Sequence, residues 1–350
     1  MVGPDAPGAS TTVVVRTATL EMVATHAGVS TSTASRALTG HPAVRPGTRE
    51  RVASAAAELR YRPNRAATAL RTRRSGLLGL VVNNLRNATF HVLAETLQAR
   101  AAERGEQVLV CTTGGDPVRE ARFLDTVRAQ GLDGVVVAGS GENGELVNAL
   151  VAEGRAVVTM NRVVEGARAP SVMSDYETAA RLATEHLVSL GHTRIGVVEG
   201  PAGVTSGQLH HAGFVGAMAE AGVPVDHTLV HRVPFDPSAG RRATRALLDA
   251  AAPPTAVLVT NHEASFGVLA VLSESAVDVP GRLSLICTED EPLWQFWSPP
   301  LSVVDNRATA LGERAADLLV AQLDDPRPPE PVAELVAPRL VLRGSTAPPP

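Results

Sequence analysis

The residues best suited to recognising another molecule lie between Leu20 and Leu38. Gly28 suits a left-handed backbone position that a Cβ atom would penalise. Ser30 is a good N-cap, because its hydroxyl can accept a hydrogen bond from a backbone N–H. This spacing predicts two short helices around a tight turn, either a DNA-binding helix-turn-helix or a generic helical hairpin. Side chains able to reach base edges or phosphates follow at the start of the second helix: Thr31, Ser32, Ser35 and Arg36.

The charge distribution favours the DNA-binding alternative. The chain has 350 residues and a net charge of −4. Residues 1–75 hold eleven arginines and four acidic residues, a charge of +7, so the rest of the chain carries −11. A small basic unit joined to an acidic body is typical of a protein that binds DNA through one end.

The first 75 residues divide into several segments. Residues 1–18 have little pattern and are expected to be a disordered leader. A third helix within 48–59 should close a small core, because apolar residues recur there at helical spacing. These residues are Val52, Ala55, Ala56 and Leu59. We therefore expect a helix-turn-helix headpiece over 19–62 and a hinge or linker over 63–75.

From residue 76 on, short apolar runs alternate with amphipathic segments. The runs expected to be strands are 77–82, 108–111, 134–138, 156–160, 194–198, 256–260 and 283–287. The segments expected to be helices are 88–104, 118–129, 176–190, 209–221, 239–251, 264–274 and 307–323. This alternation predicts an α/β fold whose parallel sheets are covered by helices on both faces. Roughly 270 residues are too many for one sheet, so two lobes are expected.

The sequence also indicates the cellular compartment of the protein. No apolar run approaches the ~18 residues of a membrane helix. The run Val13-Val14-Val15 is too short for a signal-peptide core. We therefore expect a cytoplasmic protein, associated with the nucleoid when it is bound to DNA. Cys111 and Cys287 lie in apolar runs and are expected to be reduced core residues.

Beyond these patterns, residues 19–75 closely resemble the DNA-binding headpiece and hinge of the lactose repressor family (the LacI/GalR group). The matching residues are Ala24, Ala27-Gly-Val-Ser30, Ser35-Arg36, 48–52, 61–65 and Leu70-Arg71. The body resembles the periplasmic-binding-protein-like core of the same family. It does so through residues 131–137, 183–187, 190–195, 253–257, 298–301 and 342–346.

The resemblance implies a set of DNA-contacting residues. Residues 64–71 are implied to fold as a hinge helix only when two subunits meet on DNA. Leu70 would then be an apolar wedge in the minor groove, unstacking a base step at a cost of about a few kcal/mol that added contacts offset. The alternative is an ordinary linker leucine. The implied set is Thr19, Thr31, Ser32, Thr33, Ser35, Arg36, Asn64, Arg65, Ala67, Leu70 and Arg71.

The same resemblance implies an effector-binding and dimerisation core over 76–343, followed by a tail over 344–350. The first lobe would comprise residues 76–174 and 305–334, and the second 175–304 and 335–343. The chain would cross between the lobes near 175, 304 and 335, and a small-molecule effector would lie in the cleft between them. The implied ligand-binding residues are Asn84, Phe90, Asn161, Arg162, Asp175, His210, Phe235, His262 and Glu289.

Three departures from the family pattern leave the class of effector open. His210 stands where the family usually has arginine, and His262 and Glu289 stand where aspartate is common. Arginine and aspartate make charge-assisted bonds, often bidentate, to vicinal hydroxyls. An imidazole makes only single bonds, and its charge varies near neutral pH. We expect a sugar, with a purine-like or other small metabolite as the alternative.

Together these features predict a ligand-responsive, sequence-specific DNA-binding transcriptional regulator, most often a repressor. The tail lacks the leucine heptads of a tetramerising coiled coil, so a homodimer is expected. The alternative is a solute-binding protein of the same core fold, but that would need an export signal and no headpiece. No enzyme is expected, because the adjacent Glu289-Asp290-Glu291 do not define acid–base geometry. No metal or other cofactor is expected, because His210, His211 and His262 lack matched ligand spacing.

Overall fold

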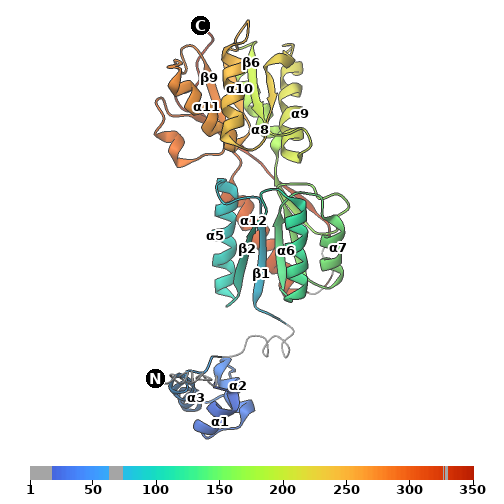
Figure 1. Cartoon of the computed structure of the whole chain (residues 1–350), viewed down its shortest axis with the longest axis vertical. Coiled ribbons are helices and arrows are strands. Elements are labelled where there is room, and N and C mark those ends of the chain that lie inside the picture. The colour runs from blue at the N-terminus through green and yellow to red at the C-terminus, as the bar shows by residue number, and fades with distance from the viewer. Residues whose placement is uncertain (1–17, 63–73, 326, 328–329) are drawn as a thin grey trace, which may run out of the picture. The chain divides into compact units, whose positions relative to one another are not determined.

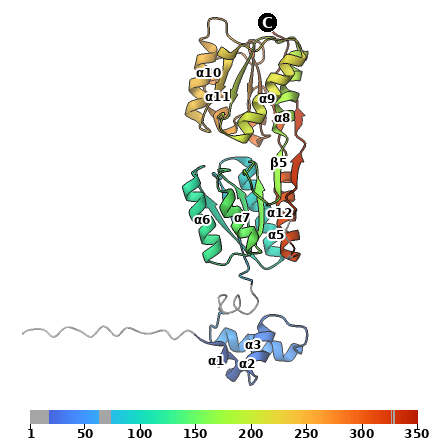
Figure 2. The same cartoon turned by 90° about the vertical axis from the view of Figure 1, so that its right-hand side faces the viewer.

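The computed structural model describes residues 18–62, 74–325, 327 and 330–350 (Figures 1 and 2). Contacts divide the chain between Ser75 and Gly76 into a small N-terminal unit and a large C-terminal unit. Within the described ranges, no helix is both long and apolar enough to cross a membrane.

The described part of the N-terminal unit contains three helices: α1 (Leu20–His26), α2 (Thr31–Leu38) and α3 (Pro46–Glu58). Gly28 has a φ of 64°, in the predicted left-handed region. Ser30 accepts a hydrogen bond from the backbone N–H of Thr33 at 3.2 Å, so it caps α2 as predicted. The core between the helices is made by side chains that are at most 2% exposed: Val23, Ala24, Ala34, Val52 and Ala55.

Two positions in this unit are locally unfavourable. Arg45 stands at the N-cap of α3, and its side chain makes no capping hydrogen bond. Arg60 follows α3 with a φ of 48°. A left-handed conformation costs a residue with a Cβ atom roughly 1–2 kcal/mol. Both arginines therefore leave room for stabilising substitutions in the headpiece.

The first lobe of the C-terminal unit is a parallel sheet in the order β11-β5-β4-β3-β1-β2. Helices α5 and α12 cover one face, and α6 and α7 cover the other. In chain order its elements are β1 (Leu77–Val82), α5 (Ala88–Glu103), β2 (Gln107–Thr112), α6 (Pro117–Ala129), β3 (Gly134–Ala138), α7 (Gly144–Ala152), β4 (Ala156–Met160), β5 (Ser171–Ser174), α12 (Ala308–Asp324) and β11 (Ala333–Val336).

The second lobe is a sheet in the order β12-β10-β9-β8-β6-β7, parallel except for β12, which runs antiparallel to β10. Helices α8 and α9 cover one face, and α10 and α11 cover the other. In chain order its elements are α8 (Tyr176–Ser189), β6 (Ile195–Glu199), α9 (Thr205–Glu220), η1 (His227–Leu229), β7 (Val230–Arg232), α10 (Pro237–Leu248), β8 (Ala256–Val259), α11 (His262–Glu274), β9 (Ser284–Thr288), η2 (Pro292–Gln295), β10 (Ser302–Asp305) and β12 (Arg339–Val341).

The chain passes between the two lobes three times, along the side where Figure 2 labels β5. The passages run from β5 into α8, from β10 into α12, and from β11 into β12. The third passage follows Val336, because β11 continues the first sheet to that residue, whereas the sequence placed this boundary at 334. These passages hold the carboxyl ends of the two sets of strands opposite each other.

Several local features differ from the sequence-based expectations. Helix α7 and the short strands β5, β7, β10, β11 and β12 were not predicted. Residues after 343, expected as a tail, pack onto the second lobe: Ser345 is fully buried, and its hydroxyl donates to the Leu285 carbonyl at 2.6 Å. Cys287 is buried as expected, but Cys111 is half-buried, because β2 is an edge strand.

Candidate functional site

The polar side chains predicted to read DNA gather on α2. Exposed among them are Thr31, Ser32 and Arg36, and half-buried are Thr33 and Ser35. The Ser32 hydroxyl lies 2.9 Å from the hydroxyl of the capping residue Ser30, which holds it at the helix tip. An exposed helix face with hydroxyls and a guanidinium can hydrogen-bond base edges and phosphates.

Thr19 has a second role in the headpiece. Its hydroxyl accepts a hydrogen bond from the backbone N–H of Met22 at 3.3 Å, so it caps α1. The other implied DNA contacts lie outside the described residues, and their roles, including the wedge, stay predictions. They are Asn64, Arg65, Ala67, Leu70 and Arg71.

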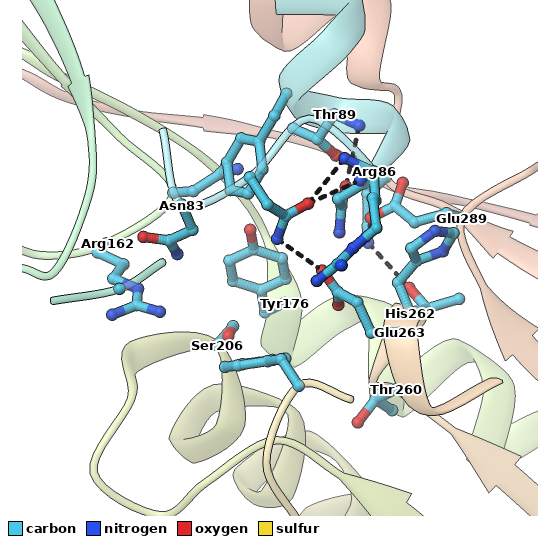
Figure 3. A pocket seen from close by; sticks show the side chains of 18 of the residues that line it. Asn83, Arg86, Thr89, Arg162, Tyr176, Ser206, Thr260, His262, Glu263 and Glu289 are labelled. Atoms are coloured by element: carbon cyan, nitrogen blue, oxygen red, sulfur yellow. Dashed lines mark hydrogen bonds between the residues drawn. The ribbon is translucent and has the colours of Figure 1, made fainter. Parts of the chain in front are cut away.

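A cavity of about 200 Å³ lies between the two lobes of the C-terminal unit, at the carboxyl ends of their strands (Figure 3). Open α/β sheets bind ligands at this place. The volume is below the roughly 300–1,000 Å³ typical of drug-sized ligands, which favours a small metabolite. The side chains around it include Asn83, Asn84, Arg86, Thr89, Phe90, Asn161 and Arg162 from the first lobe, and Tyr176, Ser206, His210, Phe235, Thr260, His262, Glu263 and Glu289 from the second.

All the ligand-binding residues implied by the sequence line this cavity except Asp175. The Asp175 carboxylate instead accepts a hydrogen bond from the backbone N–H of Thr178 at 3.0 Å and caps α8. The next residue, Tyr176, lines the cavity in its place. Asp175 therefore caps α8 and lies outside the cavity lining, and its contact with a ligand stays a prediction.

Two lining residues have left-handed backbones although they are not glycine. Asn161 has a φ of 62° after β4, and Glu289 has a φ of 64° after β9. Such conformations cost of order 1–3 kcal/mol each and persist where surrounding structure fixes them. Here the backbone N–H of Asn161 donates to the Val172 carbonyl at 3.0 Å, and that of Glu289 to the Val304 carbonyl at 2.8 Å. The strain is retained at the residues that line the cavity.

Both histidines of the cavity are held neutral. Burial lowers the pKa of His210 to about 3 and that of His262 to about 4. The His210 ring stands edge-on to Tyr176, with ring centroids 4.9 Å apart. Since neither ring carries a charge near neutral pH, each can offer one acceptor nitrogen and one N–H donor.

Glu289 is the most perturbed carboxyl group of the site. Burial raises its pKa to about 7, and the nearby carboxylates of Asp305, Glu291 and Glu263 act in the same direction. A hydrogen bond from the Asn306 amide, 2.9 Å from Glu289 Oε1, opposes the increase. This carboxyl group therefore changes its protonation state near neutral pH.

Several polar atoms around the cavity are buried and have no hydrogen-bond partner within the described parts of the chain. They are Asn83 Oδ1, Asn161 Oδ1, His210 Nε2, Thr260 Oγ1 and His262 Nδ1. Buried polar groups in native proteins are nearly always paired with protein, water or ligand. Figure 3 shows Asn83, Thr260 and His262 on different sides of the same space. The arrangement fits a small ligand that is rich in hydrogen-bonding groups.

Two sets of hydrogen bonds connect this cavity to the relative placement of the lobes. The Asn84 amide in the first lobe donates to Glu263 on α11 at 3.2 Å. The Asn306 amide bonds to Glu289 and accepts a hydrogen bond from Ser174 at the end of β5. Asn306 thus joins a strand of the first lobe to the floor of the cavity. A ligand that contacts Glu289 or Glu263 would alter these inter-lobe bonds.

The sequence did not identify Asn83, Tyr176, Glu263 or Asn306 as site residues. Three of them adjoin residues that it did identify, because strand ends and helix starts bring neighbours to the same edge. Asn306 had no signal other than its place beside the second crossover. His211 turns away, with its Nδ1 2.9 Å from the buried Glu199 carboxylate. Over the described ranges, no group of three or more His, Cys, Asp or Glu residues could hold a metal ion.

A basic helix-turn-helix unit joined to a two-lobed core with a polar cleft defines a ligand-responsive DNA-binding regulator. The comparisons agree with this class. Residues 19–64 match the bacterial regulatory proteins of the lacI family, and residues 184–346 match the periplasmic binding protein-like domain. Because a solute-binding protein of the same core fold would have no headpiece, the match over residues 19–64 does not favour that alternative.

Similar proteins match over nearly the whole chain. The transcriptional regulator MalR of Streptomyces coelicolor is 31% identical, over 95% of this chain and 97% of that protein. An HTH-type regulator from the aml 5' region of Streptomyces limosus is 32% identical, over 93% of each chain. The lac repressor dimer bound to operator and the anti-inducer ONPF has a TM-score of 0.82 and 26% identity, covering 95% of this chain and 100% of that one. The chain belongs to the lacI family of bacterial transcriptional regulators.

Proposed function

We propose that a homodimer of this chain binds a pseudo-palindromic operator on the nucleoid as a repressor, and that a sugar in the cleft changes its affinity for DNA. The set of buried, unpartnered polar atoms around the cavity carries the effector part of the proposal. A sugar supplies many hydroxyl groups, each both donor and acceptor, in a small volume. A purine-like ligand is the alternative, with fewer such groups.

A similar protein supports a sugar as the effector class. The transcriptional regulator CelR was solved as a complex with cellobiose. It is 29% identical to this chain, covering 94% of this chain and 99% of the CelR chain, with a TM-score of 0.70. Phe235 lines the cleft and offers an aromatic face of the kind that packs against apolar ring surfaces. It stands against Gly200, where a Cβ atom would come within 3.0 Å of the ring.

The dimer is supported by the surface of the core. Edge strand β2 exposes Leu109 by 40% and Val110 by 43%, and η2 and the residue after it expose Leu293 by 60% and Phe296 by 84%. An exposed apolar edge strand is a liability that proteins usually cover. One recognition helix per chain also requires two subunits to read two half-sites. We propose that a second copy covers these side chains.

The test uses the full-length protein. A DNA site is selected from a randomised pseudo-palindromic library, and its affinity is measured by fluorescence anisotropy at one fixed salt concentration. Ribose, glucose, galactose, cellobiose and adenosine are then added separately. The expected result is that a sugar raises the thermal midpoint and shifts DNA affinity at least tenfold. A shift with adenosine alone would favour the purine-like alternative, and failure to select any DNA site would overturn the regulator assignment.

The proposed dimer is tested separately, by measuring the mass of the protein in solution. Sedimentation of the free protein should give the mass of two chains, and Val110→Arg should shift it toward one chain by placing a charge in the proposed contact. Thr112→Arg places the same charge at another exposed position of β2, and its sedimentation is compared with that of Val110→Arg. A wild-type protein that sediments as one chain, both free and on operator DNA, would contradict the proposed dimer.

A further inference from the structure

Glu289 has no cationic partner among the residues that the structure describes. Its carboxyl is 7% exposed, and its one hydrogen-bond donor identified within the described residues is the neutral Asn306 amide. No arginine or histidine nitrogen of the described chain lies within ion-pair distance of it. A buried carboxylate without a counter-charge is costly, so the group must take up a proton or meet a cation.

The charged groups around Glu289 increase this requirement. At the end of β10, beside the second crossover, Asp305 acts on Glu289. Asp305 itself is paired with Arg339 at 3.1 Å. From α11, Glu263 faces Glu289 beside the neutral His262. From the loop after β9, Glu291 lies 3.3 Å from His262 and near His91 of α5, and Asp290 pairs with Arg343 at 2.6 Å. Three further carboxylates thus act on Glu289, and Arg339 and Arg343 are paired with Asp305 and Asp290. Arg307 lines a neighbouring cavity with Glu289 but makes no ion pair with it in the described chain.

The two arginines of the cavity do not supply the missing charge. Arg162 is placed at the far side of the cavity in Figure 3 and donates to the Ser140 carbonyl at 3.0 Å. Arg86 is exposed on the loop after β1. Tyr176, between them, stays neutral because burial raises its pKa. Both of these arginines belong to the first lobe, whereas Glu289 and Glu263 belong to the second.

An independent feature also calls for a hydrogen-bonding group on the ligand. His210, on α9, is 4% exposed, and its Nε2 has no hydrogen-bond partner among the described residues. Burial lowers the pKa of the His210 ring, and a hydrogen bond with the Ser206 backbone opposes this. Nε2 therefore lies in the cavity lining with its hydrogen-bonding capacity unused, at a position where arginine, the residue usual in the family, would be a donor.

We propose that the effector carries a protonated nitrogen as well as hydroxyl groups, as an amino sugar does, and that this cation sits against Glu289 of the second lobe. The proposal rests on the proposed function and narrows its ligand class. The ammonium group would replace the proton that Glu289 otherwise takes up, and a neighbouring polar group of the ligand would bond His210 Nε2. A neutral sugar leaves the acidic cluster uncompensated, and an anionic sugar adds to it.

Proton competition gives the proposal a distinct pH signature. Below neutral pH Glu289 binds a proton that a cationic ligand must displace, so affinity for an amine should rise from pH 5.5 to 7.0 by up to about tenfold per pH unit. Ordinary amines stay protonated over this range. A neutral parent sugar displaces no proton, and its affinity should change little.

Matched probes test this in the full-length protein. Titration calorimetry compares D-glucosamine with D-glucose, D-galactosamine with D-galactose, and D-mannosamine with D-mannose, at pH 5.5 and 7.0. We expect at least one amino member to bind tenfold more tightly than its parent at pH 7.0, with a smaller advantage at pH 5.5. Glu289→Gln should abolish the advantage, and Glu220→Gln on the exposed end of α9 should keep it.

The outcomes separate this proposal from the proposed function. Equal or tighter binding by the parents, an advantage that survives Glu289→Gln, or binding by no amino member overturns the cationic effector. A neutral sugar that still shifts operator affinity would then leave the proposed function standing. If Glu289→Gln does not fold, the wild-type pH dependence decides alone, because affinity for the amine that is flat between pH 5.5 and 7.0 overturns the proposal.

Discussion

Replacing Glu289 with glutamine should stabilise the effector-binding core at alkaline pH more than at acidic pH. The carboxyl has a folded-state pKa of about 7, against an ordinary value of 4.5, chiefly because it is buried. In the unfolded chain it ionises at lower pH, so between these values the folded state holds more protons. Stability from this group is therefore present below pH 4.5 and is lost as the pH rises through 7.

The magnitude follows from the difference between the two pKa values. At about 1.4 kcal/mol per pKa unit, the buried charge costs about 3 kcal/mol once the pH exceeds 7. Glutamine can still accept the hydrogen bond from Asn306 and carries no charge. About 1.4 kcal/mol of this cost is already present at pH 5.5, so about 2 kcal/mol accrues between pH 5.5 and 8. For domains of 150–250 residues, 1 kcal/mol corresponds to roughly 2–4 °C in Tm, so the variant's advantage should grow by about 4–8 °C over this range.

Differential scanning fluorimetry can follow this difference, because the Trp294 indole N–H donates to the Glu289 carbonyl oxygen at 3.0 Å. Both proteins are melted at matched ionic strength across the pH range, and Glu220→Gln serves as the surface control. Subtracting the wild-type Tm at each pH removes the titration of all groups common to both proteins. A difference in Tm that stays constant from pH 5.5 to 8 would refute an uncompensated, buried Glu289.

Other predictions concern the headpiece. Arg36→Ala should weaken binding to all DNA, whereas Ser32→Ala, at the tip of α2, should change preference at one base pair by about 1–3 kcal/mol; identical preferences for both variants across a half-site library would contradict this. Leu70→Ala should weaken operator binding but leave binding to scrambled DNA nearly intact, because arginine–phosphate contacts persist; titrations on both DNAs at one salt concentration decide, and an equal loss favours an ordinary linker leucine. Arg45→Ser should add a cap to α3 worth about 1 kcal/mol, seen as slower amide exchange at Thr48 in the full-length protein, and unchanged exchange would count against it.

Much of the headpiece could be predicted because its determinants are local. Gly28 and Ser30 act through their own backbone conformation and a hydrogen bond three residues away, so short spacing predicts the turn. The same holds for the unfavourable features, since Arg45 lacks a capping group and Arg60 adopts a left-handed conformation. The alternation of apolar runs and amphipathic segments likewise predicted two parallel sheets covered by helices.

The cleft was predicted less completely. Resemblance to the family gave many of the lining residues, but Asp175 lies outside the lining, where its carboxylate caps α8. Glu263 and Asn306 were missed, since their partners, Asn84 and Ser174, lie far away in the sequence. The short strands β10 to β12 were missed as well, because three or four residues do not show a hydrophobic period.

The sequence by itself determined the headpiece turn, the basic end and acidic body, the α/β class and the family. Those properties depend on residue type and on interactions between near neighbours. Only the tertiary structure decided that Glu289 is a buried carboxyl without a counter-charge among the described residues and that His210 is a buried, neutral imidazole. Burial and charge environment arise when three crossovers bring the strand ends of both lobes together, and no local spacing contains that information.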